Sequence, residues 1–295
     1  MVRIIFLIII FSLFVPLGVG AAVLYLEPAE SDYYQGDTFI INVRINVEEE
    51  CVNTIQADLK FSKDSLEVKD VSQGNSIISF WVKEPEFSNE NGFISFAGGI
   101  PGGFCGLLPG DPGESNLLGR IVFQARGIAD AKVEFSDTSQ VLLNDGLGTL
   151  ANLSTRGAVL AILPGMAEMP KKEWQEALEK DKTPPEVFKI EINQDPATFE
   201  GKYFITFSTT DKQTGIDYYE VKEGRRDWQK IASPYLLENQ GLKSIIKVRA
   251  ADKAGNERVA QYIPPAKLFP DWLVVLVFMG IGVIVWISSK ILQKK

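Results

Sequence analysis

Histidine is absent from this 295-residue sequence, and only two cysteines are present. Without imidazole, Ser-His-Asp and Cys-His catalysis, histidine zinc sites and histidine pH sensing are excluded. Two cysteines are too few for a four-cysteine zinc or iron–sulfur site. Because 38 Asp and Glu outnumber 30 Lys and Arg, the chain also lacks the basic footprint of a nucleic-acid binder. An enzyme that uses carboxylates alone stays possible at this stage.

The beginning of the chain is apolar. One cation, Arg3, precedes the run from Ile4 to Val15, and the small residues of Val19–Ala22 follow it. This pattern predicts a secretory signal peptide at residues 1–22 that is removed from the mature protein. An uncleaved signal anchor is the alternative.

A second apolar run lies near the other end. Residues 272–289 carry no charge and would span about 27 Å as a helix. Trp272 and Trp286 lie near its ends, where indole rings favour the membrane interface, and the lysines of residues 290–295 favour the cytoplasm. We expect one transmembrane helix in the cell membrane, with the N-terminal domains extracellular and a short cytoplasmic C-terminus. A buried core helix is the alternative.

That location gives a meaning to Cys51 and Cys105, because thiols tend to oxidise outside the cytoplasm. A disulfide between them would close a loop of about 54 residues, worth about 4 kcal/mol in the chain-entropy model. Two free thiols, or a bridge to another chain, are the alternatives.

Apolar and polar side chains alternate through residues 23–162. Phe39–Val47 and Ile55–Phe61 have period two, which predicts strands with one buried face. Turn residues interrupt the pattern, and no helical period of useful length is present, so we expect an antiparallel β-sandwich. Further strands are expected at residues 66–71, 77–82, 92–97, 117–125, 131–135 and 158–163.

One stretch of this domain is irregular. Residues 98–113 are rich in glycine but lack the Gly-Lys-Ser/Thr of a phosphate-binding loop. We expect a long loop there, attached to the domain through Cys105.

Several motifs follow one another in this domain: VNTIQADLKFSKDSLEVKD at residues 52–70, GNS at 74–76, FISFAG at 93–98, GRIVFQ at 119–124 and VLLNDGLGT at 141–149. Their order resembles that of cohesin domains. The resemblance implies a nine-stranded jelly-roll sandwich, related to carbohydrate-binding modules, that docks a dockerin on one sheet face and is not an enzyme. The cysteine pair and the single copy of the module depart from the family pattern.

Residues 163–183 form a linker, in which Pro170 could begin a short helix with a favourable Glu176–Lys180 pair. We expect a semi-rigid spacer. Residues 184–265 are again all-β, and the segments STTDKQTGIDYYEV (208–221) and VRAADKAGNE (248–257) resemble bacterial immunoglobulin-like surface repeats. An immunoglobulin-like or fibronectin-type-III-like sandwich is the expectation that follows.

A turn of the second domain contains Asp252, Asn256 and Glu257. These residues suggest a calcium loop, and the alternative that we favour is a turn in which Gly255 and Asn256 take positive φ. We expect no bound cofactor or metal.

Charge separates the two domains. Residues 22–162 hold nine Lys and Arg against twenty Asp and Glu, a net of −11, whereas residues 184–271 hold thirteen of each. The acidic domain would repel nucleic acid and could attract a basic partner. Solubility of an exposed surface is the alternative reason for the charge.

These observations predict a non-catalytic cell-surface binding or scaffold protein that docks a dockerin-like protein partner. The alternative is a carbohydrate-binding surface module for polysaccharide attachment or degradation. Its weak candidate residues are Phe93, which points opposite to Ile94, and Trp81, which points opposite to Phe80, although either ring could belong to the core. Catalysis is not expected, because no carboxylate pair stands out from a solvated acidic face.

Overall fold

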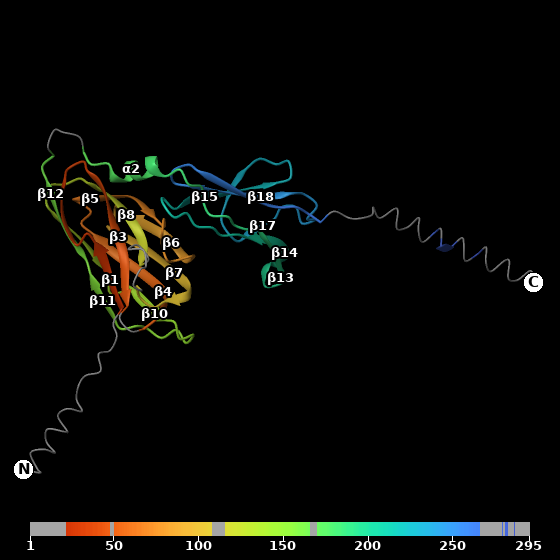
Figure 1. The fold of residues 1–295 in the computed structure, drawn as a ribbon, viewed down its shortest axis with the longest axis horizontal. Coiled ribbons are helices and arrows are strands. Elements are labelled where there is room, and N and C mark those ends of the chain that lie inside the picture. Colours follow the sequence, from red (N-terminus) through yellow and green to blue (C-terminus); the bar gives the residue numbers. More distant parts are fainter. Residues whose placement is uncertain are drawn as a thin grey trace, which may run out of the picture.

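The computed structural model describes residues 22–47, 50–107, 116–165 and 170–265, together with residues 279, 281, 282 and 286 (Figure 1). The predicted signal peptide lies outside the described residues except for Ala22, and so does the predicted transmembrane segment 272–289 except for those last four residues. Within the described part of the chain, no helix is both long and apolar enough to cross a membrane.

Two sheets form the first sandwich. The five-stranded sheet has the order β11-β1-β3-β8-β5, and the seven-stranded sheet has the order β2-β12-β9-β4-β7-β6, with β10 paired to β4. Most pairs are antiparallel, and β1–β11 and β12–β2 are parallel. The strands are β1 (Ala22–Glu27), β2 (Glu30–Tyr34), β3 (Thr38–Val47), β4 (Val52–Phe61), β5 (Leu66–Ser72), β6 (Phe80–Ser88), β7 (Phe93–Phe104), β8 (Leu117–Ala125), β9 (Asp130–Phe135), β10 (Gln140–Leu143), β11 (Leu153–Arg156) and β12 (Ala158–Leu163).

Alternate residues of these strands make the core between the two sheets. Phe39 and Ile41 of β3 are fully buried against Ile55 and Leu59 of β4, because successive side chains of a strand point to opposite faces. Phe123 of β8 joins them, with its ring centroid 6.0 Å from that of Phe39. The prediction of a two-layer β-sandwich is confirmed, and the strands expected at 117–125 and 158–163 have the bounds of β8 and β12.

The glycine-rich stretch differs from its prediction. Residues 98–104, expected in a loop, continue strand β7. Glycine is needed there because a Cβ on Gly98 would lie 2.3 Å from the Cγ2 of Ile78, and because Gly102 and Gly103 have φ of +83° and +80°.

Strand β6 is also displaced from the expected 77–82 and runs on through Pro85. Proline is tolerated because β6 is the edge strand of its sheet, where an N–H need not join a ladder.

A second, smaller sandwich follows. Its sheets have the orders β13-β14-β17 and β16-β15-β18-β19, and its core includes Ile205, Val248 and Ala250, all fully buried. The strands are β13 (Glu191–Asp195), β14 (Thr198–Thr206), β15 (Ile216–Glu223), β16 (Gln229–Ile231), β17 (Tyr235–Leu236), β18 (Ile246–Asp252) and β19 (Glu257–Tyr262). Helix α2 (Glu173–Lys180) lies between the sandwiches in sequence and contains the predicted Glu176–Lys180 pair, 3.5 Å apart.

Candidate functional site

The outer face of the seven-stranded sheet is the candidate site. Core residues of β4 and β7 point inward, so the residues between them point outward. In register, Asp58 lies opposite Ser95, and Lys83 of β6 lies opposite Ala97. We define the outer face by the residues of β4, β6 and β7 that point away from the core: Gln56, Asp58, Lys60, Phe80, Lys83, Glu86, Phe93, Ser95, Ala97 and Gly99.

A hydrogen-bonded network orders the middle of this face. The Ser95 hydroxyl donates to Asp58, and the Lys83 ammonium donates to Ser95 Oγ at 2.8 Å. The Gln56 amide donates to the other Asp58 oxygen at 2.8 Å, and Lys83 also pairs with Glu86 at 2.8 Å. The side chains are therefore held in place before any partner binds, which lowers the entropy cost of binding.

Asp58 is the centre of the network. Burial alone would raise the pKa of its carboxyl group, but hydrogen bonds from Ser95, Gln56 and Thr138, with the nearby Lys83 charge, outweigh burial and hold that pKa below its usual value. The face carries two acids and two bases, Asp58 and Glu86 against Lys60 and Lys83. The net acidity of the first sandwich therefore lies elsewhere on its surface.

Small residues form a floor between two aromatic rings. Ala97 and Gly99 of β7 add little height to the sheet, and Phe93 and Phe80 point outward beside them. The Phe80 side chain is 64% exposed. A low floor between aromatic side chains can accept a flat or helical partner surface, and aromatic side chains are enriched at protein interfaces.

The two predicted aromatic candidates lie on opposite faces of the sheet. Phe93 is on the outer face, opposite Lys60 and Ser88 in register. Trp81 turns inward, with its ring edge-on to Phe96 at 5.9 Å. Its neighbour Phe80 takes the exposed position instead. Sequence alternation places Trp81 and Phe80 on opposite faces, but does not decide which of the two is outside.

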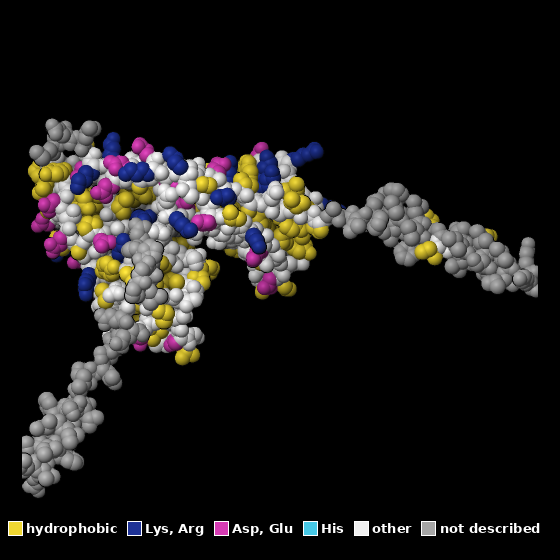
Figure 2. Space-filling model, in the orientation of Figure 1, with side chains coloured by type: hydrophobic (Ala, Val, Ile, Leu, Met, Phe, Trp, Pro, Cys, Tyr) yellow, Lys and Arg dark blue, Asp and Glu magenta, His cyan; other side chains and the backbone are white. Residues whose placement is uncertain are grey.

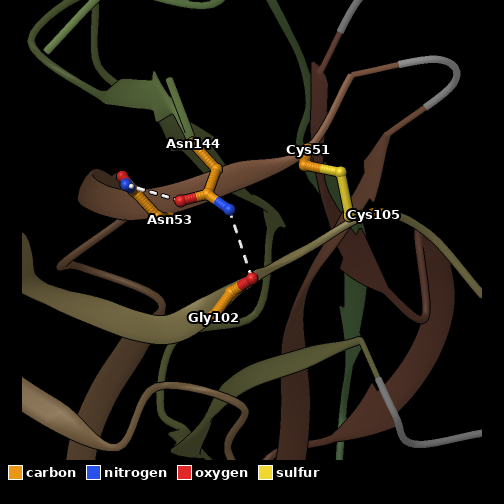
Figure 3. Close-up of a disulfide and its surroundings, with 5 residues drawn as sticks. All are labelled: Cys51, Asn53, Gly102, Cys105 and Asn144. Atoms are coloured by element: carbon orange, nitrogen blue, oxygen red, sulfur yellow. Dashed lines mark hydrogen bonds between the residues drawn. A yellow bond between two sulfur atoms is a disulfide. The ribbon is translucent and has the colours of Figure 1, made fainter. Parts of the chain in front are cut away.

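A disulfide joins Cys51 and Cys105 at one end of this sheet (Figure 3). Asn144 ties the same end together: its N–H donates to the Cys51 carbonyl at 2.8 Å, and its amide donates to the Gly102 carbonyl at 3.2 Å. Asn53 donates to the Asn144 side chain at 3.1 Å. The end of β7 is therefore attached to β4 by one covalent bond and several hydrogen bonds.

Three buried carboxylates meet where the linker reaches the second sandwich. One ligand oxygen from each of Asp181, Asp211 and Asp252 lies within 4.8 Å of the others. Carboxylate oxygens are the donors that a hard cation prefers, and Asp181 and Asp211 had no part in the calcium loop considered from sequence.

The turn residues Asp252, Asn256 and Glu257 interact with other groups of the second sandwich. Asp252 accepts from the N–H and amide of Asn256 at 2.8 and 2.9 Å, and Glu257 pairs with Arg249 at 3.0 Å. Gly255 has the predicted positive φ, +87°, and Asn256 does not. The turn is built by hydrogen bonds among its own residues, as the alternative to a calcium loop requires.

A cleft of about 1460 Å³ separates the two sandwiches on the side of β6 (Figure 2). Phe80, Val82 and Phe87 line one wall, and Val187 and Tyr218 line the other. The cleft is continuous with the outer face at Phe80.

Comparisons with known proteins found neither a matching family model nor a matching curated protein. Among solved structures, the chain is similar to a non-cellulosomal cohesin from the hyperthermophilic archaeon Archaeoglobus fulgidus, at 14% identity and a TM-score of 0.39, over 54% of this chain and 98% of that one.

It is also similar to a type I cohesin–dockerin complex from Clostridium thermocellum, at 13% identity and a TM-score of 0.38, over 50% of this chain and 95% of that one. A cohesin module from a family 33 glycoside hydrolase of Clostridium perfringens matches at 10% identity and a TM-score of 0.38, over 50% and 98%. The dockerin in the second of these structures is a partner of that cohesin.

Proposed function

We propose that this chain is a non-catalytic binding protein whose first sandwich docks a dockerin-like protein on the outer face. The observation that carries the proposal is the low floor of Ala97 and Gly99 between Phe80 and Phe93, beside the ordered Asp58–Ser95–Lys83 network. The cohesin-like order of sequence motifs, in a family that docks its partner on one sheet face, supports it.

The test measures binding of the full chain to a panel of purified dockerin modules. Ala97→Arg places a long cation on the floor of the outer face, where Ala97 is half-buried and points outward, so the fold tolerates it. We expect the wild-type chain to retain at least one dockerin and the Ala97→Arg variant to lose it.

Val159→Arg is the matched control. Val159 is exposed on the same sheet, and its strand β12 lies three strands from β7. That separation is about 14 Å at the usual strand spacing. Binding that survives Ala97→Arg would place the interface elsewhere, and a chain that retains no dockerin would remove the docking function.

We propose further that the protein is displayed outside the cell. The apolar segment 272–289 would be the membrane anchor, residues 1–22 the secretion signal, and the second sandwich, which we propose to be immunoglobulin-like, a stalk. Protease added to intact cells should remove the first sandwich, and carbonate extraction should leave the chain in the membrane. Protection of both sandwiches from protease would contradict this location.

Glycan binding is a second candidate, and the exposed ring of Phe80 and the half-buried ring of Phe93 on one face of the sheet favour it. Glycan-array binding should then fall in Phe80→Ala and in Phe93→Ala. An array without signal for the wild-type chain would remove this candidate and leave protein docking untouched.

A further inference from the structure

Lys171 and Glu173, at the start of helix α2, hydrogen-bond to the beginning of strand β3. Beyond the β1–β3 ladder, which ends at Asn42, the Thr38 N–H donates to the Lys171 carbonyl at 2.8 Å and the Ile40 N–H to the Glu173 carboxylate at 3.1 Å. The Lys171 N–H donates to Asp37 at 2.7 Å. The linker, which the sequence predicts to be a semi-rigid spacer, is therefore bound to the first sandwich.

The two sandwiches then meet backbone to backbone. A Cβ on Gly74, just after β5, would lie 2.3 Å from the carbonyl oxygen of Gln213 in the second sandwich. A Cβ on Gly215 would lie 2.8 Å from the nitrogen of Gly74. The Asn75 N–H donates to the Asp211 carbonyl at 3.3 Å. Two backbone segments therefore occupy the space that side chains at Gly74 and Gly215 would need.

Side chains surround the glycine contact. The fully buried Ser72 hydroxyl donates to the Thr214 carbonyl at 2.7 Å, and Arg120 donates to the Gln213 carbonyl at 2.9 Å. Lys253 of the second sandwich pairs with the Asp70 carboxylate and donates to the Val71 carbonyl at 3.1 Å. Most of these bonds end on main-chain carbonyls: those of Gln213 and Thr214 belong to a turn, and that of Val71 belongs to β5.

The turn at residues 211–215, whose carbonyls accept these bonds, is stabilised by its own hydrogen bonds. One Asp211 oxygen accepts the N–H groups of Gln213, Thr214 and Gly215 at 3.0, 2.8 and 2.9 Å. The Thr214 hydroxyl donates to Asp181, at the end of the linker, at 2.6 Å. The linker, this turn and the neighbouring strands β3, β8 and β5 thus form a closed ring of contacts.

We propose that this ring, the brace, makes the two sandwiches one rigid body and holds the outer face at a constant angle to the second sandwich. Two domains joined by a polar interface usually move relative to each other. Here the linker supplies a second attachment, and the main chains interlock at Gly74 and Gly215. This rigidity is independent of the proposed partner.

The test is a distance distribution between the two sandwiches in the full chain, measured by pulsed electron spin resonance. Spin labels on p-acetylphenylalanine at Asp137 and Arg225, both exposed, avoid new cysteines beside the disulfide. One narrow peak is expected for the wild-type chain. A broad or multiple-peaked distribution would overturn the proposal.

Two glycine variants give a matched comparison. Neither Gly74 nor Gly99 has a positive φ, so alanine can adopt the φ angle of either position. A Cβ on Gly99 would have its nearest neighbour at 3.7 Å, an ordinary contact. We expect Gly74→Ala to broaden the distribution and Gly99→Ala to leave it narrow.

Lys253→Met is a second test of the brace, to be used if Gly74→Ala fails to fold. It keeps an apolar chain of similar length and removes the pair with Asp70. Broadening by Lys253→Met at low salt supports the brace, and narrow peaks in both variants would overturn it.

Discussion

The two sandwiches differ in how completely they bury the aromatic residues of their cores. The aromatic residues at the centre of the first core, Phe39, Phe96 and Phe123, have no exposed surface. Those of the second core, Phe188 and Phe207, keep 9% and 5% exposure. A smaller domain buries a smaller fraction of its surface, so it gains less from the hydrophobic effect.

The two sandwiches also differ in their cross-links and in their buried carboxylates. The first sandwich carries the disulfide, and the second has none. Among the described residues, the second sandwich buries three carboxylates that accept backbone N–H groups, Glu223, Asp211 and Asp252, whereas the first buries one, Asp37. The two sandwiches therefore differ in their means of support: a disulfide and a fully buried aromatic core in the first, and several buried carboxylates in the second.

The disulfide gives the largest expected effect. Replacing Cys51 and Cys105 with alanine should destabilise the first sandwich by about 4 kcal/mol, because the cross-link restricts a 54-residue loop in the unfolded chain. Denaturant unfolding of the full chain, followed by tryptophan fluorescence, measures the loss. A reducing agent should reproduce it in the wild-type chain and add nothing in the variant. An equal loss of stability in both sandwiches would contradict the conclusion that the disulfide stabilises the first sandwich in particular.

Glu223 tests the polar support of the second sandwich. Its two oxygens accept the N–H groups of Glu238 and Asn239 at 2.9 Å each, so Glu223→Ala leaves both donors without this acceptor. We expect a loss of about 1–3 kcal/mol, confined to the second sandwich. Glu223→Gln keeps one acceptor and should lose less. Hydrogen exchange of the two amides reports the site directly, and unchanged exchange in Glu223→Ala would refute its role.

The smallest effect concerns pH. Burial, with the nearby charges of Asp181 and Asp211, raises the pKa of Asp252 above its ordinary value of 3.8, although hydrogen bonds from Asn256 oppose the rise. The folded state therefore binds this proton more tightly than the unfolded state. The stability that this proton contributes is present below pH 3.8 and is lost as the pH rises through the pKa of Asp252 in the folded state.

Asp252→Asn should remove that part of the pH dependence. Urea unfolding from below pH 3.8 to neutrality, with EDTA present throughout, measures it. Glu176→Gln, on the exposed face of α2, is the control and should keep the wild-type profile. An unchanged profile in Asp252→Asn would show that this carboxylate does not couple to folding.

Strand positions followed well from the sequence where the pattern was regular. β12 agrees with its predicted bounds, and its burial alternates along the strand, because alternation at period two reflects a local property, the opposite orientation of successive side chains. β6 and the end of β7 did not, because Pro85 at a sheet edge and the glycines of β7 read as breaks when neighbouring strands are unknown.

Residue patterns were enough to predict the all-β character, the pair of cysteines and the opposite facing of Phe80 and Trp81. The tertiary structure alone decided that Phe80 is outside, that Asp181, Asp211 and Asp252 meet, and that Gly74 touches Gly215. The physical reason is range. Alternation follows from the backbone of one strand, whereas these meetings join residues tens to more than a hundred positions apart, and only the packing of sheets brings them together.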